Sequence, residues 1–131
     1  MAHDQQQEHV VLFVCLHGMG MSRLAAAFFN SSAPAGWPAV SAGIEPGDTL
    51  SPTAARLLAG TPAEPFLDHD VPRSIDSVPL AERVIAIRNP AIRFELPEAE
   101  TWDLLRTEFN GQMCDEIRTR SQRLAEQVGH R

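Results

Sequence analysis

The chain has 131 residues, with 17 acidic side chains and 11 lysine or arginine side chains, so its formal net charge is −6. This length suits one domain with a hydrophobic core and is short for two. All 11 of these basic residues are arginine, and the sequence contains neither lysine nor tyrosine. Schiff-base catalysis, a lysine-dependent phosphate loop and a tyrosyl acid or nucleophile are therefore excluded.

Charge and cysteine content also limit the expected partners. A negative net charge argues against a nucleic-acid partner, because binding to phosphates draws on a surplus of basic side chains. No apolar run approaches the roughly 18 residues of a membrane span, and residues 1–9 are polar and unlike a signal peptide. Cys15 and Cys114 form neither a CxxC pair nor a zinc-binding spacing. We expect a cytoplasmic protein with free thiols, no cofactor, no structural metal and no membrane or nucleic-acid partner.

The first part of the chain predicts a strand, a glycine loop and a helix. We expect residues 1–8 to form a disordered leader and residues 9–131 to form a single domain. A continuous apolar run at 10–15 is typical of a strand buried on both faces of a parallel sheet. The next loop contains Gly18 and Gly20, and Ser22 is the expected N-cap of the alanine-rich helix that follows.

A second strand and a second helix follow. The strand is expected at 39–43, and Ser51 is the expected N-cap of the helix. Pro52 occupies the first helical position, and Gly60 lies just past the end.

The remaining elements complete an alternating pattern. Residues 61–79 carry four prolines and predict an irregular connection with a short helical turn near 74–80. Strands are expected at 83–88 and 101–104, and a last helix at 111–128, in which Cys114 packs beside the apolar stripe Met113, Ile117, Leu124 and Val128. Strands that alternate with helices predict an α/β three-layer sandwich with a mainly parallel four-stranded sheet.

Cys15 is the leading candidate for a functional residue because it ends the first strand. In parallel sheets the ligand crevice lies beyond the carboxyl ends of the strands. A glycine loop that leads into a helix also offers free N–H groups to an anion. A thiol at this point is a candidate nucleophile, and a small buried core cysteine is the alternative.

The segment from Val11 to Ser22 resembles the low-molecular-weight protein tyrosine phosphatase family and its arsenate reductase relatives. Their motif is a cysteine, five residues, an arginine, and then serine or threonine. The resemblance extends over residues 41–47, over the helix that begins at Pro52 and over Trp102 with Asp103, so it covers the chain from residue 9. It implies that Cys15 is the nucleophile and that Ser22 hydrogen-bonds its thiolate. It also implies an anion-binding loop made of Leu16, His17, Gly18, Met19, Gly20 and Met21.

Three departures from the family pattern affect the chemistry. Met21 stands where the family has its arginine, and Arg23, two positions later, is a candidate substitute. The Asp-Pro pair of the family's general acid is absent, which leaves Asp103 as a candidate, with Glu98 and Glu100 near it in sequence. The region 85–100 contains none of the further cysteines that arsenate reductases use to pass on their oxidation. We therefore expect weak or lost phosphatase activity, as in a pseudoenzyme.

Other interpretations of the same loop stay open. One is a thiol-dependent enzyme that acts on a different substrate. Another is a non-catalytic binding or regulatory protein that takes a small anion, another small molecule or a protein partner. The alternation of Cys15, His17, Met19 and Met21 would also suit Cu(I), which prefers soft ligands, if the segment were extended.

Overall fold

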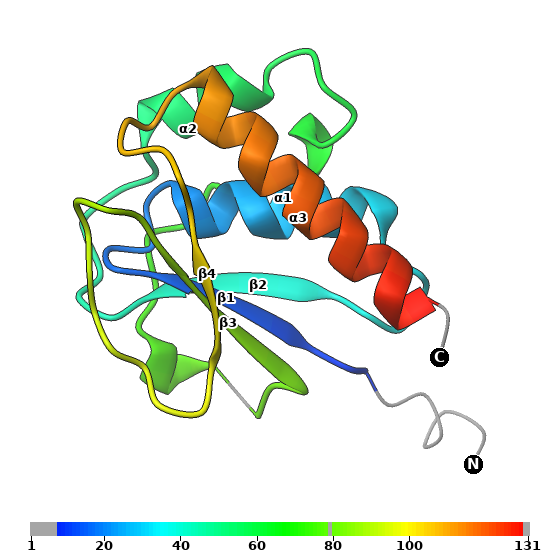
Figure 1. Ribbon diagram of the computed structural model, residues 1–131. Helices are drawn as coiled ribbons and strands as arrows, with labels where there is room; N and C mark the ends of the chain where they lie inside the picture. Colours follow the sequence, from blue (N-terminus) through cyan, green and yellow to red (C-terminus); the bar gives the residue numbers. More distant parts are fainter. Residues whose placement is uncertain (1–7, 79, 130–131) are drawn as a thin grey trace.

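The computed structural model describes residues 8–78 and 80–129, so the expected leader lies outside the described residues except for Glu8. Four strands form one parallel sheet in the order β2-β1-β3-β4 (Figure 1). They are β1 (Val11–Cys15), β2 (Ala39–Gly43), β3 (Arg83–Arg88) and β4 (Glu100–Asp103). The helices are α1 (Met21–Ser32), α2 (Pro52–Leu58) and α3 (Gly111–Gly129), with short 3-10 turns η2 (Glu64–Phe66) and η3 (Ile75–Ser77). This architecture confirms the predicted α/β fold with a four-stranded parallel sheet.

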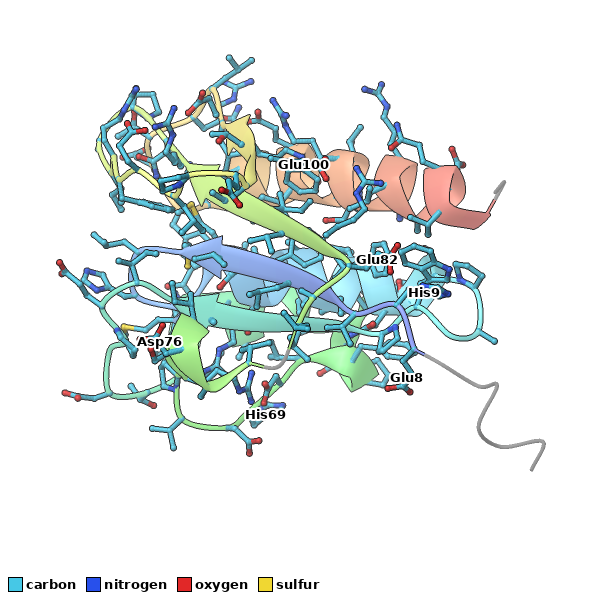
Figure 2. All side chains as sticks on the ribbon, turned by 90° about the horizontal axis from the view of Figure 1, so that it is seen from below. Glu8, His9, His69, Asp76, Glu82 and Glu100 are labelled. Atoms are coloured by element: carbon cyan, nitrogen blue, oxygen red, sulfur yellow. The ribbon has the colours of Figure 1, made fainter. Side chains whose placement is uncertain are left out.

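Strand β1 is an inner strand of the sheet, and all five of its side chains are buried. It pairs with β2 on one side, where Cys15 is in register with Gly43, and with β3 on the other. Figure 2 shows His9 and Glu82 at the amino ends of β1 and β3, where His9 Nδ1 lies 3.1 Å from Glu82 Oε1. The carboxyl ends of the strands lie at the opposite edge, and Cys15 is there.

The three helices lie on one face of the sheet (Figure 1). Helix α1 packs against β1, β2, α2 and α3, and residues of all three helices share one hydrophobic core with β1 and β3. On the other face Leu12, Val14 and Ala42 form a smaller cluster that is covered by η3 and by the irregular segments that carry Val78, Ala81, Phe94 and Leu96. The second covering layer of the sandwich is thus made of turns and loops in the described part of the chain.

Several local predictions can be compared with the structure. Ser51 caps α2 by accepting a hydrogen bond from the Ala54 N–H, and Gly60 has a φ of +79° just past that helix. Cys114 is buried in the main core as predicted. The prediction that Ser22 is the N-cap of α1 was wrong. The N-cap is Gly20, two residues earlier, and the Ser22 hydroxyl pairs with Cys15 instead.

Within residues 8–78 and 80–129, no helix has both the length and the apolar character that a membrane span needs.

Candidate functional site

The loop between β1 and α1 turns its carbonyl groups toward the rest of the protein. Six consecutive carbonyl oxygens, from Cys15 to Gly20, each accept a hydrogen bond at 2.8–3.2 Å. The donors are the backbone N–H groups of Ile44, Glu45, Gly47, Ser51 and Leu24 and the side chain of Arg23. The backbone of the loop is therefore held mainly through its carbonyl acceptors.

The amide donors of the same loop are left available. For the N–H groups from Leu16 to Gly20, no acceptor is recorded among the described residues. The first N–H groups of α1, which starts at Met21, lack intrahelical partners as in any helix. Successive free N–H groups before a helix N-terminus form a concave site that favours an anion.

Two glycines make this curled loop possible. Gly18 has a φ of +66°, in the left-handed region, and a Cβ there would lie 2.9 Å from the Gly43 backbone nitrogen. A Cβ on Gly43 would in turn lie 2.6 Å from the His17 carbonyl carbon. The loop thus lies directly against the end of β2, where neither position has room for a side chain.

Cys15 and Ser22 form a buried pair at the base of the loop. The Cys15 Sγ lies 3.1 Å from the Ser22 Oγ, and the two residues are 3% and 0% exposed. Cys15 also lines a pocket of about 230 Å³. The other lining residues are Leu16, His17, Met19, Gly20, Met21, Ser51, Asn89, Ile92, Thr107 and Phe109. The structure thus brings Cys15 together with five of the six predicted loop residues, and the sixth, Gly18, does not line the pocket.

Arg23 lies behind the loop and does not line this pocket. It is 1% exposed, its Nε donates to the Gly18 carbonyl at 2.9 Å, and its Nη1 donates to the Asp68 carbonyl at 2.6 Å. Burial lowers the pKa of Arg23, and the nearby carboxylate of Asp68 opposes that change. This placement gives Arg23 a positioning role, because it holds the Gly18 carbonyl away from the pocket.

The four side chains that were candidate Cu(I) ligands, Cys15, His17, Met19 and Met21, each contact a different partner. Cys15 pairs with Ser22, and the His17 Nδ1 lies 2.9 Å from the Glu45 carbonyl. The Met19 side chain lies over Gly47, and the Met21 Sδ is 3.7 Å from the Asn89 Nδ2. Among the described residues no group of three or more His, Cys, Asp and Glu side chains is placed to hold a metal ion. That finding does not cover methionine ligands, all four residues line the same pocket, and the Cu(I) interpretation stays a prediction.

The candidate acids are engaged outside the pocket. Both carboxylate oxygens of Asp103 accept hydrogen bonds from Arg88, at 2.8 and 3.0 Å, and these bonds lower the pKa of Asp103. A general acid at neutral pH needs the opposite change. Glu100 is paired with Arg83, and Glu98 lines a pocket on the other face of the sheet.

Sequence reasoning missed five residues that line the pocket: Ser51, Asn89, Ile92, Thr107 and Phe109. Asn89 follows the last residue of β3, so the rule that ligands bind at the carboxyl ends of parallel strands would have found it. The other four residues come from turns and loops, and no local pattern marks them.

No family model matches the sequence, and the comparison with curated proteins found no match. Solved structures do match. An arsenate reductase from Archaeoglobus fulgidus has a TM-score of 0.69 and 29% identity, over 88% of this chain and 98% of that chain. A structure described as an arsenate reductase in the phosphate binding state has a TM-score of 0.72 and 18% identity, over 91% of this chain and 98% of that chain. A low-molecular-weight protein tyrosine phosphatase from T. tengcongensis has a TM-score of 0.68 and 19% identity, over 92% and 99%. The chain has the fold of low-molecular-weight phosphatases and arsenate reductases, which confirms the resemblance seen in its sequence.

Proposed function

We propose that the Cys15 loop binds an oxyanion and that the hydrolase or reductase chemistry of similar proteins is weak or lost in this chain. One observation carries the proposal: all six carbonyls from Cys15 to Gly20 are used by the protein, and the N–H groups from Leu16 to Gly20 have no recorded acceptor among the described residues. Such a loop offers donors to a negatively charged group. The similar arsenate reductases and phosphatases support this choice of ligand.

The expected loss of activity follows from two missing functions. When a cysteine thiolate attacks a phosphate ester, a sulfur–phosphorus bond forms and the ester oxygen leaves with its electron pair and takes up a proton. The growing charge on the phosphoryl oxygens needs preorganised donors, and the Met21 side chain offers neither a charge nor an N–H group. The leaving oxygen needs an acid, and Asp103 is held ionised by Arg88.

The pair of Cys15 and Ser22 keeps a second candidate function open. The buried hydroxyl at 3.1 Å is placed to stabilise a thiolate, which a purely structural cysteine does not need. A thiol-dependent enzyme that acts on a different small substrate would retain this pair. We place either activity in the cytoplasm, with a small anion or small molecule as the ligand and a protein partner as a further candidate.

A binding assay and a turnover assay on the same protein separate these functions. Phosphate and arsenate should raise the thermal unfolding temperature in a saturable way, while hydrolysis of p-nitrophenyl phosphate stays at background. Met21→Arg should strengthen phosphate binding, and Arg56→Met, an exposed change on α2, serves as the control. Absence of any oxyanion effect would refute the anion site. Efficient hydrolysis by the unmodified protein that Cys15→Ser abolishes would refute the loss of activity.

A further inference from the structure

Asn89 is a buried side chain of the pocket whose orientation is determined by the backbone. It follows β3 at the carboxyl edge of the sheet, is 3% exposed and lines the same pocket as Cys15. Its Oδ1 accepts hydrogen bonds from the backbone N–H groups of Ala91 and Ile92, both at 2.8 Å. An amide oxygen accepts hydrogen bonds and an amide nitrogen donates them. The terminal atom that accepts from Ala91 and Ile92 is therefore Oδ1, and the other terminal atom is Nδ2.

The Nδ2 group of Asn89 has donor capacity that the protein does not use. Its one recorded partner in the described part of the chain is the Met21 Sδ at 3.7 Å, and a thioether sulfur is a weak acceptor. An amide nitrogen carries two N–H bonds, and an unpaired donor in a buried position costs free energy. A ligand oxygen in the pocket beside Met21 would satisfy this donor together with the loop amides.

The pocket offers these donors without a permanent positive charge. No arginine, aspartate or glutamate is among its lining residues, and its aliphatic, thioether and aromatic side chains are Leu16, Met19, Met21, Ile92 and Phe109. Behind the loop, the charge of Arg23 is opposed by Asp68, whose carboxylate lies 3.9 Å from it and 2.9 Å from Arg73. Asp70 pairs with Arg73 in turn, so the two arginines and two aspartates of this cluster balance.

The charge of the ligand follows from the cost of desolvation. The free energy needed to move an ion out of water rises with the square of its charge, so a doubly charged ion loses about four times as much as a singly charged one. Neutral N–H donors, without a cation, compensate a single charge better than a double one. The apolar wall also favours a ligand with a small apolar group beside its charged end.

We propose that the pocket selects singly charged oxyanions that carry a small apolar group, with the Asn89 Nδ2 as the side-chain donor in place of a cation. Small alkyl sulfonates have this chemistry. The inference rests on the proposed anion site and adds the charge class of its ligand and the side chain that contacts it.

Two sulfur oxyanions of different charge provide the test. Calorimetric titrations of the full-length protein with methanesulfonate and with sulfate are compared at neutral pH and equal ionic strength. Methanesulfonate carries one charge and a methyl group, and it should bind at least about tenfold more tightly than sulfate. Equal or tighter binding of sulfate would overturn this inference and leave the anion site standing. Binding of neither ion would overturn both.

A pair of matched variants tests the role of Asn89. Asn89→Asp keeps the oxygen that Ala91 and Ile92 need but replaces the N–H donor with a carboxylate oxygen that repels an anion, and it should weaken methanesulfonate binding at least about a hundredfold. Asn30→Asp makes the same change in a side chain that bonds Ala39 away from the pocket, and it should leave binding unchanged. Wild-type affinity in a folded Asn89→Asp protein would contradict the assignment. If that variant does not fold, Met21→Arg decides, because an added cation should improve sulfate binding more than methanesulfonate binding.

Discussion

Arg23 stabilises the Cys15 loop from behind rather than from the ligand side. Its guanidinium donates to the carbonyls of Gly18 and Asp68, and the first bond is buried while the second is partly buried. A buried cation of this kind is costly to place and more costly to remove, because its partners are left without a donor. The absence of a cation at Met21, in the pocket, and the presence of the buried Arg23 behind the loop are therefore separate features, and each has its own test.

Replacing Arg23 should lower stability substantially. Arg23→Met leaves the two carbonyls and the Asp68 carboxylate without this donor, and we expect the free energy of unfolding to fall by about 3 kcal/mol in urea. Arg56→Met is the matched control, because the Arg56 side chain is exposed and its one recorded hydrogen bond in the described part of the chain goes to Thr53, so the effect should stay within about 0.5 kcal/mol. Equal effects of the two substitutions would show that the buried contacts contribute little.

Asp103 is expected to be dispensable for any residual activity. Its carboxylate is exposed, is bound by Arg88 and does not line the Cys15 pocket. Asp103→Asn should therefore leave the rate of p-nitrophenyl phosphate hydrolysis within about twofold of the wild-type value at every pH from mildly acidic to neutral. Loss of an acidic limb from the pH profile in this variant would identify Asp103 as a proton donor after all.

Among the elements, the Cys15 loop depends on its close contact with the end of β2. Gly18→Ala places a methyl group against the Gly43 backbone at a position with a φ of +66°, and we expect a loss of about 3 kcal/mol in unfolding free energy. Gly60→Ala has a similar φ of +79° but open space around it, so it should cost only about 1 kcal/mol. Equal losses would mean that the contact with Gly43 is not limiting.

The ion pairs of Asp68 should make the stability of the protein depend on pH in acid. Burial opposes the charge of Asp68, but the Asp70 N–H and the cations Arg73 and Arg23 together lower its pKa below the ordinary value of 3.8. A carboxylate whose pKa is lowered by folding contributes stability above its unfolded pKa and loses it as the pH falls through the folded value. The stability difference between wild type and Asp68→Asn should therefore shrink below pH 3.8. Urea unfolding across this range checks it, and a constant difference would contradict it.

The carboxyl edge of the whole sheet assembles the pocket from distant segments. Cys15 and its loop follow β1, Asn89 follows β3, and Thr107 and Phe109 lie between β4 and α3. All three helices cover the same face of the sheet (Figure 1). Residues of β1 and α1, which border the pocket, belong to the main hydrophobic core.

The sequence predicts those parts of this arrangement that have local causes. Apolar runs predict the strands, and Ser51, Pro52 and Gly60 predict the limits of α2, because capping and turn preferences act between neighbouring residues. The contact between Ser22 and Cys15 takes the hydroxyl away from helix capping, and the N-cap prediction failed for that reason. The placement of Arg23 depends on Asp68, which is distant in sequence, so its role was not visible in local patterns, whereas the position of Asn89 directly after β3 marks it.

Amide chemical shifts measure directly whether the backbone amides of the Cys15 loop bind an oxyanion. In a ¹⁵N-labelled sample titrated with phosphate, we expect saturable shifts of the N–H signals of Leu16 to Gly20, with one common dissociation constant. The amides of Arg118 and Arg123 on α3 should stay unchanged. If the loop signals do not move, or move only together with those of exposed arginines, the loop is not an anion site.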